Sequence, residues 1–235
     1  MQPFNEKKSA NLSSEALQVL ARVSPERNFR GDTLAQAVVN LSRLFTTSRP
    51  SLPSRYLDDP AHAAAYLSYF LPVNLSKIQV LLDELSGDNG QEKLDRPMAV
   101  LDLGCGPGTG SLALLDWLWH RSPERAKSVS VLAADISETS LRDTERLWKA
   151  YCQEVGISGA NLRCVEGNLE HPLKGDLGKQ IVRTGPYDLI ILANCLNELF
   201  STAANPPAER AAVVGQLLPF LSTHGTIMIV EPALR

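Results

Sequence analysis

The stretch VLDLGCGPGTG at residues 100–110 decides the fold of this chain, because a short apolar run leads straight into a glycine-rich loop. The apolar run ends in Asp102, and every second position after it is glycine. The loop glycines are Gly104, Gly106, Gly108 and Gly110. Glycine at this density indicates that the backbone turns tightly and that another group approaches it closely. We therefore expect a strand, a ligand-binding loop and a helix in succession.

Five short apolar runs after residue 97 predict the rest of the sheet. They are MAVLDLG (98–104), VSVLAAD (129–135), NLRCVEG (161–167), YDLIILAN (187–194) and GTIMIVEP (225–232). Continuous apolar character without alternation is typical of strands that are buried on both faces. Helical patterns lie between most of these runs, and strands that alternate with helices indicate an α/β fold with a parallel sheet. We predict a Rossmann-like, doubly wound parallel sheet with strand order 3-2-1-4-5.

The first 90 residues have a different pattern, with apolar residues at helical spacing and no strand-like run. The polar stretch SGDNGQEKLDRP at 86–97 is typical of a connector. We therefore predict two parts, a helical N-terminal domain or cap at 1–90 and the Rossmann-like domain at 91–235.

Composition excludes several classes of function. The 235 residues carry a formal net charge of −3 with a pI of about 5.8, so no overall positive field indicates nucleic-acid binding. The chain has no apolar segment of signal-peptide type and no run of the ~20 apolar residues that span a membrane, so we expect a cytoplasmic protein without a membrane partner. The four cysteines show no CxxC spacing, which predicts no metal site and no disulfide framework.

The loop itself excludes two common ligands. A dinucleotide fingerprint GxGxxG fails, because its third glycine falls on Thr109 or on Ser111 in the two possible frames. A P-loop fails as well, because no lysine follows the loop before Lys127. The acidic Asp102 before the loop would repel a pyrophosphate and would favour a cationic ligand. S-adenosylmethionine has an ammonium, a sulfonium and no phosphate, and it is the cofactor that we predict.

The ends of the later strands predict the rest of the cofactor site. Asp135 can accept hydrogen bonds from the ribose hydroxyls. Ile136 can cover one face of the adenine, and Asn168 can accept a hydrogen bond from the adenine amine. Asn194 would border the cofactor through its backbone carbonyl. Such strand-end residues can also be helix caps. The predicted cofactor-binding residues are Asp102, Gly104, Cys105, Gly106, Gly108, Asp135, Ile136, Asn168, Leu169 and Asn194.

Candidate catalytic residues follow the fourth strand. Asn197 and Glu198 lie where the transferred methyl group is expected, and Glu198 is either a general base or a solvated or capping glutamate early in a helix. Cys195 suggests covalent catalysis, but it has no evident activating base in the sequence, so we interpret it as a buried structural thiol. Methyl transfer also proceeds without a dedicated base when the acceptor is held in line.

Residues 98–235 resemble the class I S-adenosylmethionine-dependent methyltransferases. Three stretches resemble a smaller group, the methyltransferase-like proteins of small ribosomal subunit assembly, which occur in mitochondria and bacteria. They are AAAYLSYFLPVNLSKIQVLLDEL (63–85), ILANCLNEL (191–199) and IMIVEPALR (227–235). This resemblance spans roughly residues 56–235. It implies binding to ribosomal RNA or to the small ribosomal subunit, with methylation of the RNA.

The chain departs from this group at its C-terminal end. Members of the group typically continue into a cysteine-bearing metal or iron–sulfur segment, and methyltransferase sheets have two further strands. We therefore expect this chain to be truncated after its fifth strand. Two other functions fit the sequence: a small-molecule methyltransferase with a helical cap, and a ribosome-assembly binding module without catalysis.

Overall fold

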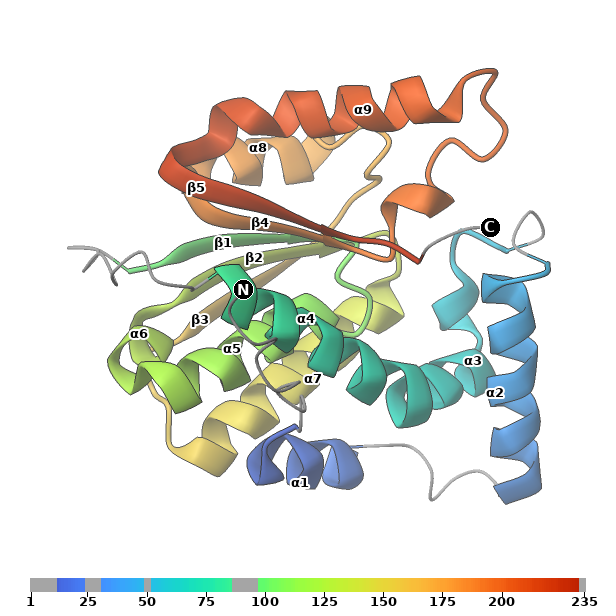
Figure 1. Ribbon diagram of the computed structural model, residues 1–235, viewed down its shortest axis with the longest axis horizontal. Helices are drawn as coiled ribbons and strands as arrows, with labels where there is room; N and C mark the ends of the chain where they lie inside the picture. Colours follow the sequence, from blue (N-terminus) through green and yellow to red (C-terminus); the bar gives the residue numbers. More distant parts are fainter. Residues whose placement is uncertain (1–11, 24–30, 49–51, 86–96, 233–235) are drawn as a thin grey trace, which may run out of the picture.

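The computed structural model describes residues 12–23, 31–48, 52–85 and 97–232, which form a five-stranded sheet with helices on both faces (Figure 1). The strands are β1 (Ala99–Leu103), β2 (Ser130–Asp135), β3 (Asn161–Glu166), β4 (Tyr187–Ala193) and β5 (Leu221–Val230). All neighbouring strands pair in parallel, in the order β3-β2-β1-β4-β5. The predicted fold and strand order are confirmed, and each predicted apolar run contains part or all of a strand.

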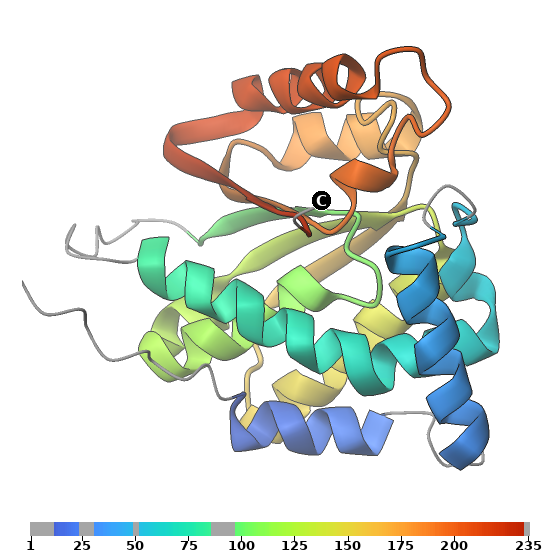
Figure 2. The same cartoon turned by 45° about the vertical axis from the view of Figure 1, so that its right-hand side comes forward.

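The helices that connect the strands divide between the two faces of the sheet (Figures 1 and 2). The helices α5 (Thr109–Arg121) and α7 (Glu138–Val155) lie on one face together with α4 (Leu71–Leu85). The helices α8 (Gly175–Thr184) and α9 (Pro206–Leu217) cover the other face. The short helix α6 (Pro123–Ser128) follows α5. This alternation puts the carboxyl ends of all five strands at one edge of the sheet.

The described part of the chain that precedes α4 contains helices, turns and loops and no strand. It contains α1 (Ser14–Val23), α2 (Gly31–Phe45), the 3-10 turn η3 (Tyr56–Asp58), α3 (Pro60–Ala65) and the π-helical turn η4 (Tyr66–Phe70). The Asp59 carboxylate caps α3 by accepting hydrogen bonds from the amides of Ala61 and His62 at 2.9 and 3.0 Å. The helices α3, η4 and α4 follow one another directly, and a π turn inside such a helix is often found at a functional site.

Two hydrophobic cores lie on the two faces of the sheet. The core beneath α4, α5 and α7 also contains Val19 of α1 and Leu41 of α2, both fully buried. Leu177 and Ile181 of α8 and Leu217 of α9 fill the core on the other face. The N-terminal helices therefore share a core with the sheet, and the division of the chain into residues 1–90 and 91–235 stays a prediction.

The connection after β4 is irregular where it passes the carboxyl edge of the sheet. It contains the 3-10 turn η5 (Leu196–Glu198), and a second 3-10 turn, η6 (Leu218–Phe220), precedes β5. Within the described ranges, no helix combines the length and the apolar character needed to cross a membrane.

Candidate functional site

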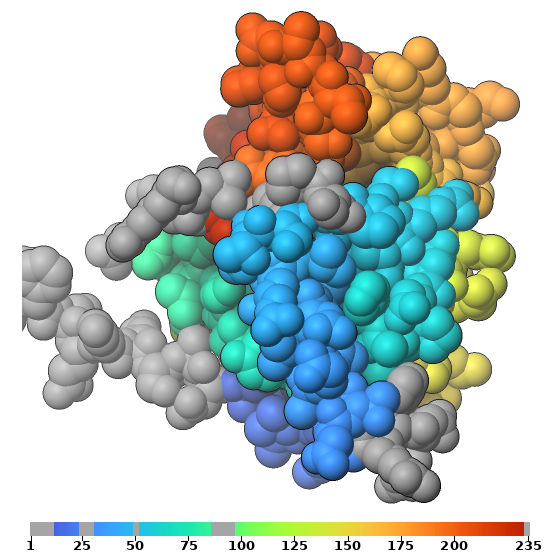
Figure 3. Space-filling model, turned by 90° about the vertical axis from the view of Figure 1, so that its right-hand side faces the viewer, coloured from blue at the N-terminus to red at the C-terminus, as the bar shows by residue number. Residues whose placement is uncertain are grey.

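A cavity of about 460 Å³ opens at the carboxyl edge of the sheet, between the strand ends and the N-terminal helices. Figure 3 looks onto this edge, and α2 together with residues 52–70 covers it. Ligands of doubly wound sheets bind at this edge, and the volume lies within the range of small-molecule sites. We call the side formed by the loops after β1, β2, β3 and β4 the strand-end wall. We call the side formed by Phe45, residues 54–57 and residues 66–77 the cap wall.

The glycine loop forms the base of the strand-end wall. Gly104 has a φ of +66°, and a β-carbon placed on it would lie 2.5 Å from Cys195 Cβ. Gly106 has a φ of +53°, and a β-carbon there would have only Leu57 Cδ1, at 3.8 Å, near it and would extend into the cavity. The Gly106 backbone is therefore a surface that a ligand can approach directly, as the sequence predicts.

Asp102 lies behind this loop and does not line the cavity. Its carboxylate is 1 % exposed and accepts hydrogen bonds from Ser111 N at 2.7 Å and Ser111 Oγ at 2.6 Å. Gly108, the residue before α5, has no side chain that could cap this helix. The Asp102 carboxylate near the end of β1 takes that role, because it accepts the hydrogen bond of the third amide of α5, Ser111 N. Burial raises the pKa of Asp102 to about 6. The described contacts of Asp102 are therefore those of a cap, and its predicted role toward the ligand's ammonium stays a prediction.

Asp135 connects the end of β2 with the glycine loop. Its carboxylate accepts hydrogen bonds from the amides of Gly106 at 2.8 Å and Ser137 at 2.9 Å, one on each oxygen. Burial raises the pKa of Asp135 in spite of these two bonds. A carboxylate has about four acceptor sites, and Asp135 lines the cavity, so it can accept a further hydrogen bond from a ligand.

Three other predicted cofactor residues line the cavity beside Asp135: Ile136, Asn168 and Leu169. Asn168 Oδ1 accepts a hydrogen bond from Glu170 N at 2.9 Å, which orients the side chain and leaves one lone pair on this oxygen. Leu169 is buried and packs over Gly104, whose β-carbon would lie 3.1 Å from Leu169 Cδ1.

The end of β4 completes the strand-end wall. Asn194 lines the cavity with a φ of +59°, a left-handed conformation that asparagine adopts more readily than most residues. Its neighbour Cys195 is buried and donates a hydrogen bond to Leu103 O at 3.3 Å. Burial and then the Glu231 carboxylate raise the pKa of the Cys195 thiol well above its ordinary value. Cys195 is therefore a protonated thiol, which agrees with a structural role.

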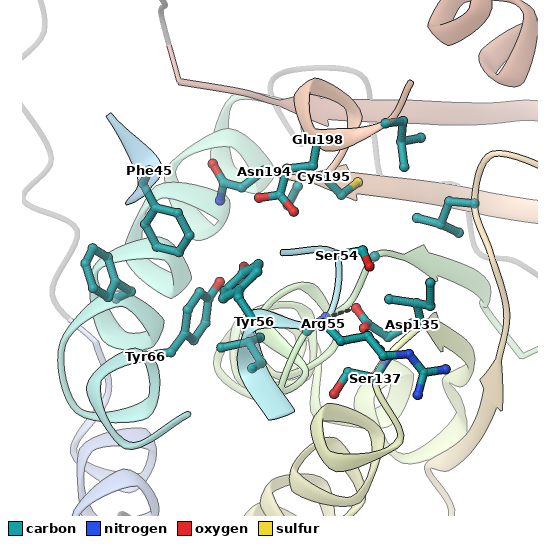
Figure 4. A pocket seen from close by; sticks show the side chains of 18 of the residues that line it. Phe45, Ser54, Arg55, Tyr56, Tyr66, Asp135, Ser137, Asn194, Cys195 and Glu198 are labelled. Carbon is teal, nitrogen blue, oxygen red and sulfur yellow. Dashed lines mark hydrogen bonds between the residues drawn. The ribbon is translucent and has the colours of Figure 1, made fainter. Parts of the chain in front are cut away.

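The two candidate catalytic residues lie in different places. Glu198 lines the cavity, and its side chain points toward the rings of the cap wall (Figure 4). Asn197 does not line it, because Arg210 of α9 holds it from outside, with hydrogen bonds to Asn197 Oδ1 at 3.4 Å and to Asn197 O at 2.9 Å. Glu198 is the one of the two that can contact a substrate.

Most of the predicted cofactor residues gather in one place. Those that line the cavity are Gly104, Gly106, Asp135, Ile136, Asn168, Leu169 and Asn194. Cys105 and Gly108 lie behind the loop, where Cys105 is buried and a β-carbon on Gly108 would lie 2.8 Å from Thr144 Cγ2. These two residues shape the loop from the side of α7. Their contact with a cofactor stays a prediction.

The sequence did not identify the aromatic side chains of the cap wall as site residues. Four aromatic rings line the cavity from α2, η3 and η4: Phe45, Tyr56, Tyr66 and Phe70. The ring of Phe45 packs edge-on against Tyr56, Tyr66 and Phe70, with centroid distances of 5.4, 6.4 and 5.1 Å. The signal for two of these residues was already in the sequence, because Tyr66 and Phe70 belong to the AYLSYFLP stretch that carries the family resemblance.

Burial keeps both tyrosines of the cap wall protonated. It raises the pKa of Tyr56 well above its ordinary value, and the nearby Glu198 carboxylate raises it further. Burial also raises the pKa of Tyr66, whose hydroxyl lies 3.4 Å from Thr109 Oγ1 and 3.5 Å from Asn74 Nδ2. The cap wall therefore offers neutral rings with hydroxyl groups.

The described part of the chain contains no cluster of three or more His, Cys, Asp or Glu side chains that could hold a metal ion. All four cysteines are free thiols.

Parallel order 3-2-1-4-5, with a glycine loop after β1 and an acid after β2, is the arrangement of a Rossmann-like doubly wound fold. Among solved structures, the chain is similar to the CurJ carbon methyltransferase, with a TM-score of 0.50 and 16% identity over 96% of this chain and 53% of that chain. At this identity, the likeness shows the fold.

Two further solved structures are similar at lower TM-scores. One is an O-methyltransferase family protein from Burkholderia thailandensis, with a TM-score of 0.42 and 20% identity over 79% of this chain and 44% of that chain. The other is magnesium protoporphyrin IX methyltransferase from Synechocystis PCC 6803 with bound SAH, with a TM-score of 0.40 and 22% identity over 65% of this chain and 54% of that chain. The chain spans about half the length of these proteins. It matches no protein-family model and no curated protein.

Proposed function

We propose that this protein binds S-adenosylmethionine at the strand-end wall and transfers its methyl group to an acceptor in the same cavity. The observation that carries the proposal is the pairing of Gly106 with Asp135. The glycine presents bare backbone to the cavity, and the carboxylate bonded to its amide lines the cavity beside it as a hydrogen-bond acceptor. Asp135 would hold the ribose hydroxyls, and Ile136 and Asn168 would hold the adenine. When bound, the cofactor supplies an electrophilic methyl group on a sulfonium.

The charges of the cavity support a cofactor without phosphate. The charged residues of the strand-end wall are Asp135, Glu170 and Glu198, and all three are acidic. Lys77 of the cap wall could hold the carboxylate of the cofactor's amino-acid part. Protein groups then orient the acceptor and exclude water, and such positioning supplies much of the rate enhancement.

Calorimetric titration with S-adenosylhomocysteine tests the cofactor site. We expect micromolar affinity for the wild type and a loss of about tenfold or more for Asp135→Asn, because a charge-assisted hydrogen bond is replaced by a neutral one. The matched control is Asp143→Asn on α7, where the aspartate pairs with Arg146 at 2.9 Å away from the cavity. If the wild type does not bind, or if both variants bind equally well, the cofactor site is refuted.

A second candidate is ribosomal RNA of the small subunit, or the assembling subunit, as the methyl acceptor. It is supported by the resemblance of residues 56–235 and by the fact that all three of its stretches provide cavity residues. These are Tyr66 and Phe70 from the first, Glu198 and Leu199 from the second, and Pro232 from the third. The test is methylation of a small-subunit RNA fragment, with binding measured at two salt concentrations, since phosphate contacts make affinity fall steeply with salt. Cofactor-dependent RNA binding without turnover would favour the non-catalytic assembly module.

A further inference from the structure

One part of the cavity remains unassigned after the cofactor is placed, namely the space beside the aromatic rings of the cap wall. These rings come from α2, η3 and η4, and all of them line the cavity: Phe45, Tyr56, Tyr66 and Phe70. Figure 4 shows Phe45 and Tyr66 apart from Asp135, where the ribose is proposed to bind. We call the space bounded by these four rings the ring pocket.

The ring pocket adjoins the glycine loop. The Tyr66 hydroxyl lies 3.4 Å from Oγ1 of Thr109, the first residue of α5 after the loop. Leu57, the neighbour of Tyr56 in η3, places its Cδ1 3.8 Å from a β-carbon built on Gly106. A molecule in the ring pocket would therefore lie beside the cofactor that the glycine loop is proposed to hold.

The geometry of the rings suits a further ring. Phe45 stands edge-on to the other three rings, at interplanar angles of 81–89°. Tyr66 and Phe70 are inclined to each other by 31°, with their centroids 6.0 Å apart. Aromatic groups prefer edge-to-face and offset stacked arrangements of this kind. The cluster therefore offers both ring edges and ring faces to an aromatic ligand.

Three of the four rings are only partly buried by the chain: Phe45, Tyr56 and Phe70. Each of them packs against the hydrophobic core and also lines the cavity. An apolar molecule in the ring pocket would remove more of this aromatic surface from water, and the burial of apolar surface favours binding.

The hydrogen-bonding groups of the ring pocket are neutral. Burial raises the pKa of Tyr56 and of Tyr66, so both hydroxyls keep their protons. Asn194 at the end of β4 lines the same cavity (Figure 4), and its side-chain amide can donate and accept hydrogen bonds. Such groups can bind a neutral polar substituent of an aromatic molecule.

The charged residues of the cavity do not favour an ionic acceptor. Glu198 and Lys77 have partners within the chain, Lys77 through a hydrogen bond from its ammonium to Asn74 Oδ1 at 3.1 Å. Arg55 Nη2 is bonded to Glu166 Oε1 at 2.6 Å, and Figure 4 shows its guanidinium pointing away from the rings. Grooves that stack nucleic-acid bases on aromatic rings are positively charged, whereas the charged residues of the strand-end wall are acidic. These surroundings favour a small neutral molecule over a nucleic-acid strand.

We propose that the methyl acceptor is a small, uncharged, planar aromatic molecule whose ring binds in the ring pocket against Phe45, Tyr56 and Phe70. This inference rests on the proposed function, and it selects among acceptors that the proposed function leaves open. The rings bind the aromatic body of the acceptor, and Asn194 and the tyrosine hydroxyls are available to its polar substituent. The four rings are therefore specificity-determining residues.

The transfer to a hydroxyl on such an acceptor balances. A lone pair of the hydroxyl oxygen forms the new bond to the methyl carbon, while the carbon–sulfur bond breaks and leaves its electron pair on sulfur. The proton of the hydroxyl passes to water. The rings take no part in these bond changes and act by holding the acceptor beside the cofactor.

The test compares three bicyclic molecules: 2-naphthol, its saturated analogue decahydro-2-naphthol, and the anion 2-naphthoate. Their binding is measured by calorimetry on the protein saturated with S-adenosylhomocysteine, so the readout does not depend on turnover. We expect 2-naphthol to bind about tenfold more tightly than the saturated alcohol, which has no ring faces to stack, and than the anion. With S-adenosylmethionine, mass spectrometry should detect methylated 2-naphthol.

Variants of the ring pocket locate the effect. Phe45→Leu and Phe70→Leu each keep an apolar side chain and remove a ring, so we expect about fivefold weaker binding of 2-naphthol and less than about twofold change for the saturated alcohol. The matched control is Phe220→Leu in η6, because Phe220 is also partly buried and does not line the cavity. S-adenosylhomocysteine binding by each variant reports on correct folding.

The outcomes separate the two proposals. Equal binding of the aromatic and the saturated alcohol, binding of none of the three molecules, or equal losses for both alcohols in the variants overturns the aromatic inference, while S-adenosylhomocysteine binding keeps the proposed function. Methylation of a small-subunit RNA fragment without methylation of 2-naphthol also overturns it, in favour of the second candidate. Failure of the wild type to bind S-adenosylhomocysteine overturns the proposed function and this inference together.

Discussion

The two walls of the cavity are held in place by different interactions. The strand-end wall depends on backbone geometry: the amides of Gly104 and Cys105 donate to Ala134 O at 2.8 and 3.1 Å, and Gly106 N donates to Asp135. The cap wall depends on ring packing around Phe45. Backbone hydrogen bonds to a buried sheet allow little adjustment, whereas packed rings can rearrange when one of them is changed.

This difference predicts different roles for the two walls, which experiments can distinguish. Substitutions in the strand-end wall should destabilise the fold and remove cofactor binding together, because the same backbone atoms serve both. Substitutions in the cap wall should cost less stability and should alter acceptor binding while leaving the cofactor site intact. Four predictions test this division, from the largest expected effect to the smallest.

The largest effect is expected at Gly104. Alanine there must adopt a φ of +66° and place its β-carbon 2.5 Å from Cys195 Cβ, so we expect a loss of about 4 kcal/mol in the free energy of unfolding, with loss of S-adenosylhomocysteine binding. Gly156 at the end of α7 is the control, since its φ is +72° with nothing within 4 Å of an added β-carbon. Gly156→Ala should cost about 1 kcal/mol. Urea unfolding measures the loss of stability in both variants. Equal losses would show that the positive φ of Gly104, and not its contact with Cys195 at the end of β4, makes alanine unfavourable there.

The second effect depends on pH and concerns Asp102. Burial raises its pKa from the ordinary value of 3.8 to about 6 in the native state, so the native state binds a proton more tightly than the unfolded chain does. The free energy of unfolding of the wild type should therefore fall, relative to that of Asp102→Asn, as the pH rises from about 4 to about 7, by on the order of 3 kcal/mol. Urea unfolding of both proteins across this range checks the prediction, and parallel pH profiles would contradict it.

Asp102 also shows which part of the site could not be predicted from the sequence. An acid before a glycine loop fits a ligand's ammonium, and it fits equally the free amides of the next helix. Sequence alone does not separate these uses, because both need the acid at the same position. The structure gives Asp102 the contacts of a cap, with Ser111 as its partner. Gly110 is small for the same reason, since its β-carbon would lie 2.7 Å from Asp102 Oδ1.

The strands could be predicted because burial on both faces leaves a continuous apolar run, and their order could be predicted with them. The place of Asp135 and Asn168 in the cavity could be predicted because the carboxyl ends of parallel strands meet at one edge of the sheet. The place of Phe45 and Tyr56 in the cavity could not be predicted, because both residues lie on helical segments without any ligand-binding pattern. Their place in the cavity depends on how α2 and η3 pack against distant parts of the chain, which local spacing does not encode.

The third prediction concerns the centre of the cap wall. Phe45→Ala removes the ring that contacts three other rings, and we expect a loss of about 2 kcal/mol in the free energy of unfolding, since the side chain is only partly buried. S-adenosylhomocysteine affinity should change less than about threefold, because Asp135 and the glycine loop keep their hydrogen bonds. Val39→Ala on the same helix is the control, because Val39 is 44% exposed. A loss of cofactor affinity as large as that of Asp135→Asn would break the division between the walls.

The smallest effects are expected at the two polar contacts that join the walls. Ser137 Oγ donates to Asp58 Oδ1 at 2.5 Å, and Arg55 pairs with Glu166 at 2.6 Å with both side chains about half exposed. A double-mutant cycle of Ser137→Ala with Asp58→Asn should give a coupling energy of about 1 kcal/mol. The cycle of Arg55→Gln with Glu166→Gln should give about 0.5 kcal/mol at low salt and less at high salt.

These cycles decide how the cap wall is held against the strand-end wall. If the Asp58 cycle has the larger coupling and is insensitive to salt, a partly buried hydrogen bond positions η3 over the end of β2, and the cavity is closed by polar contacts as well as by rings. If both couplings are near zero, ring packing alone holds the cap wall. The cap wall would then be free to move on acceptor binding while Asp135, bonded to Gly106, stays in place.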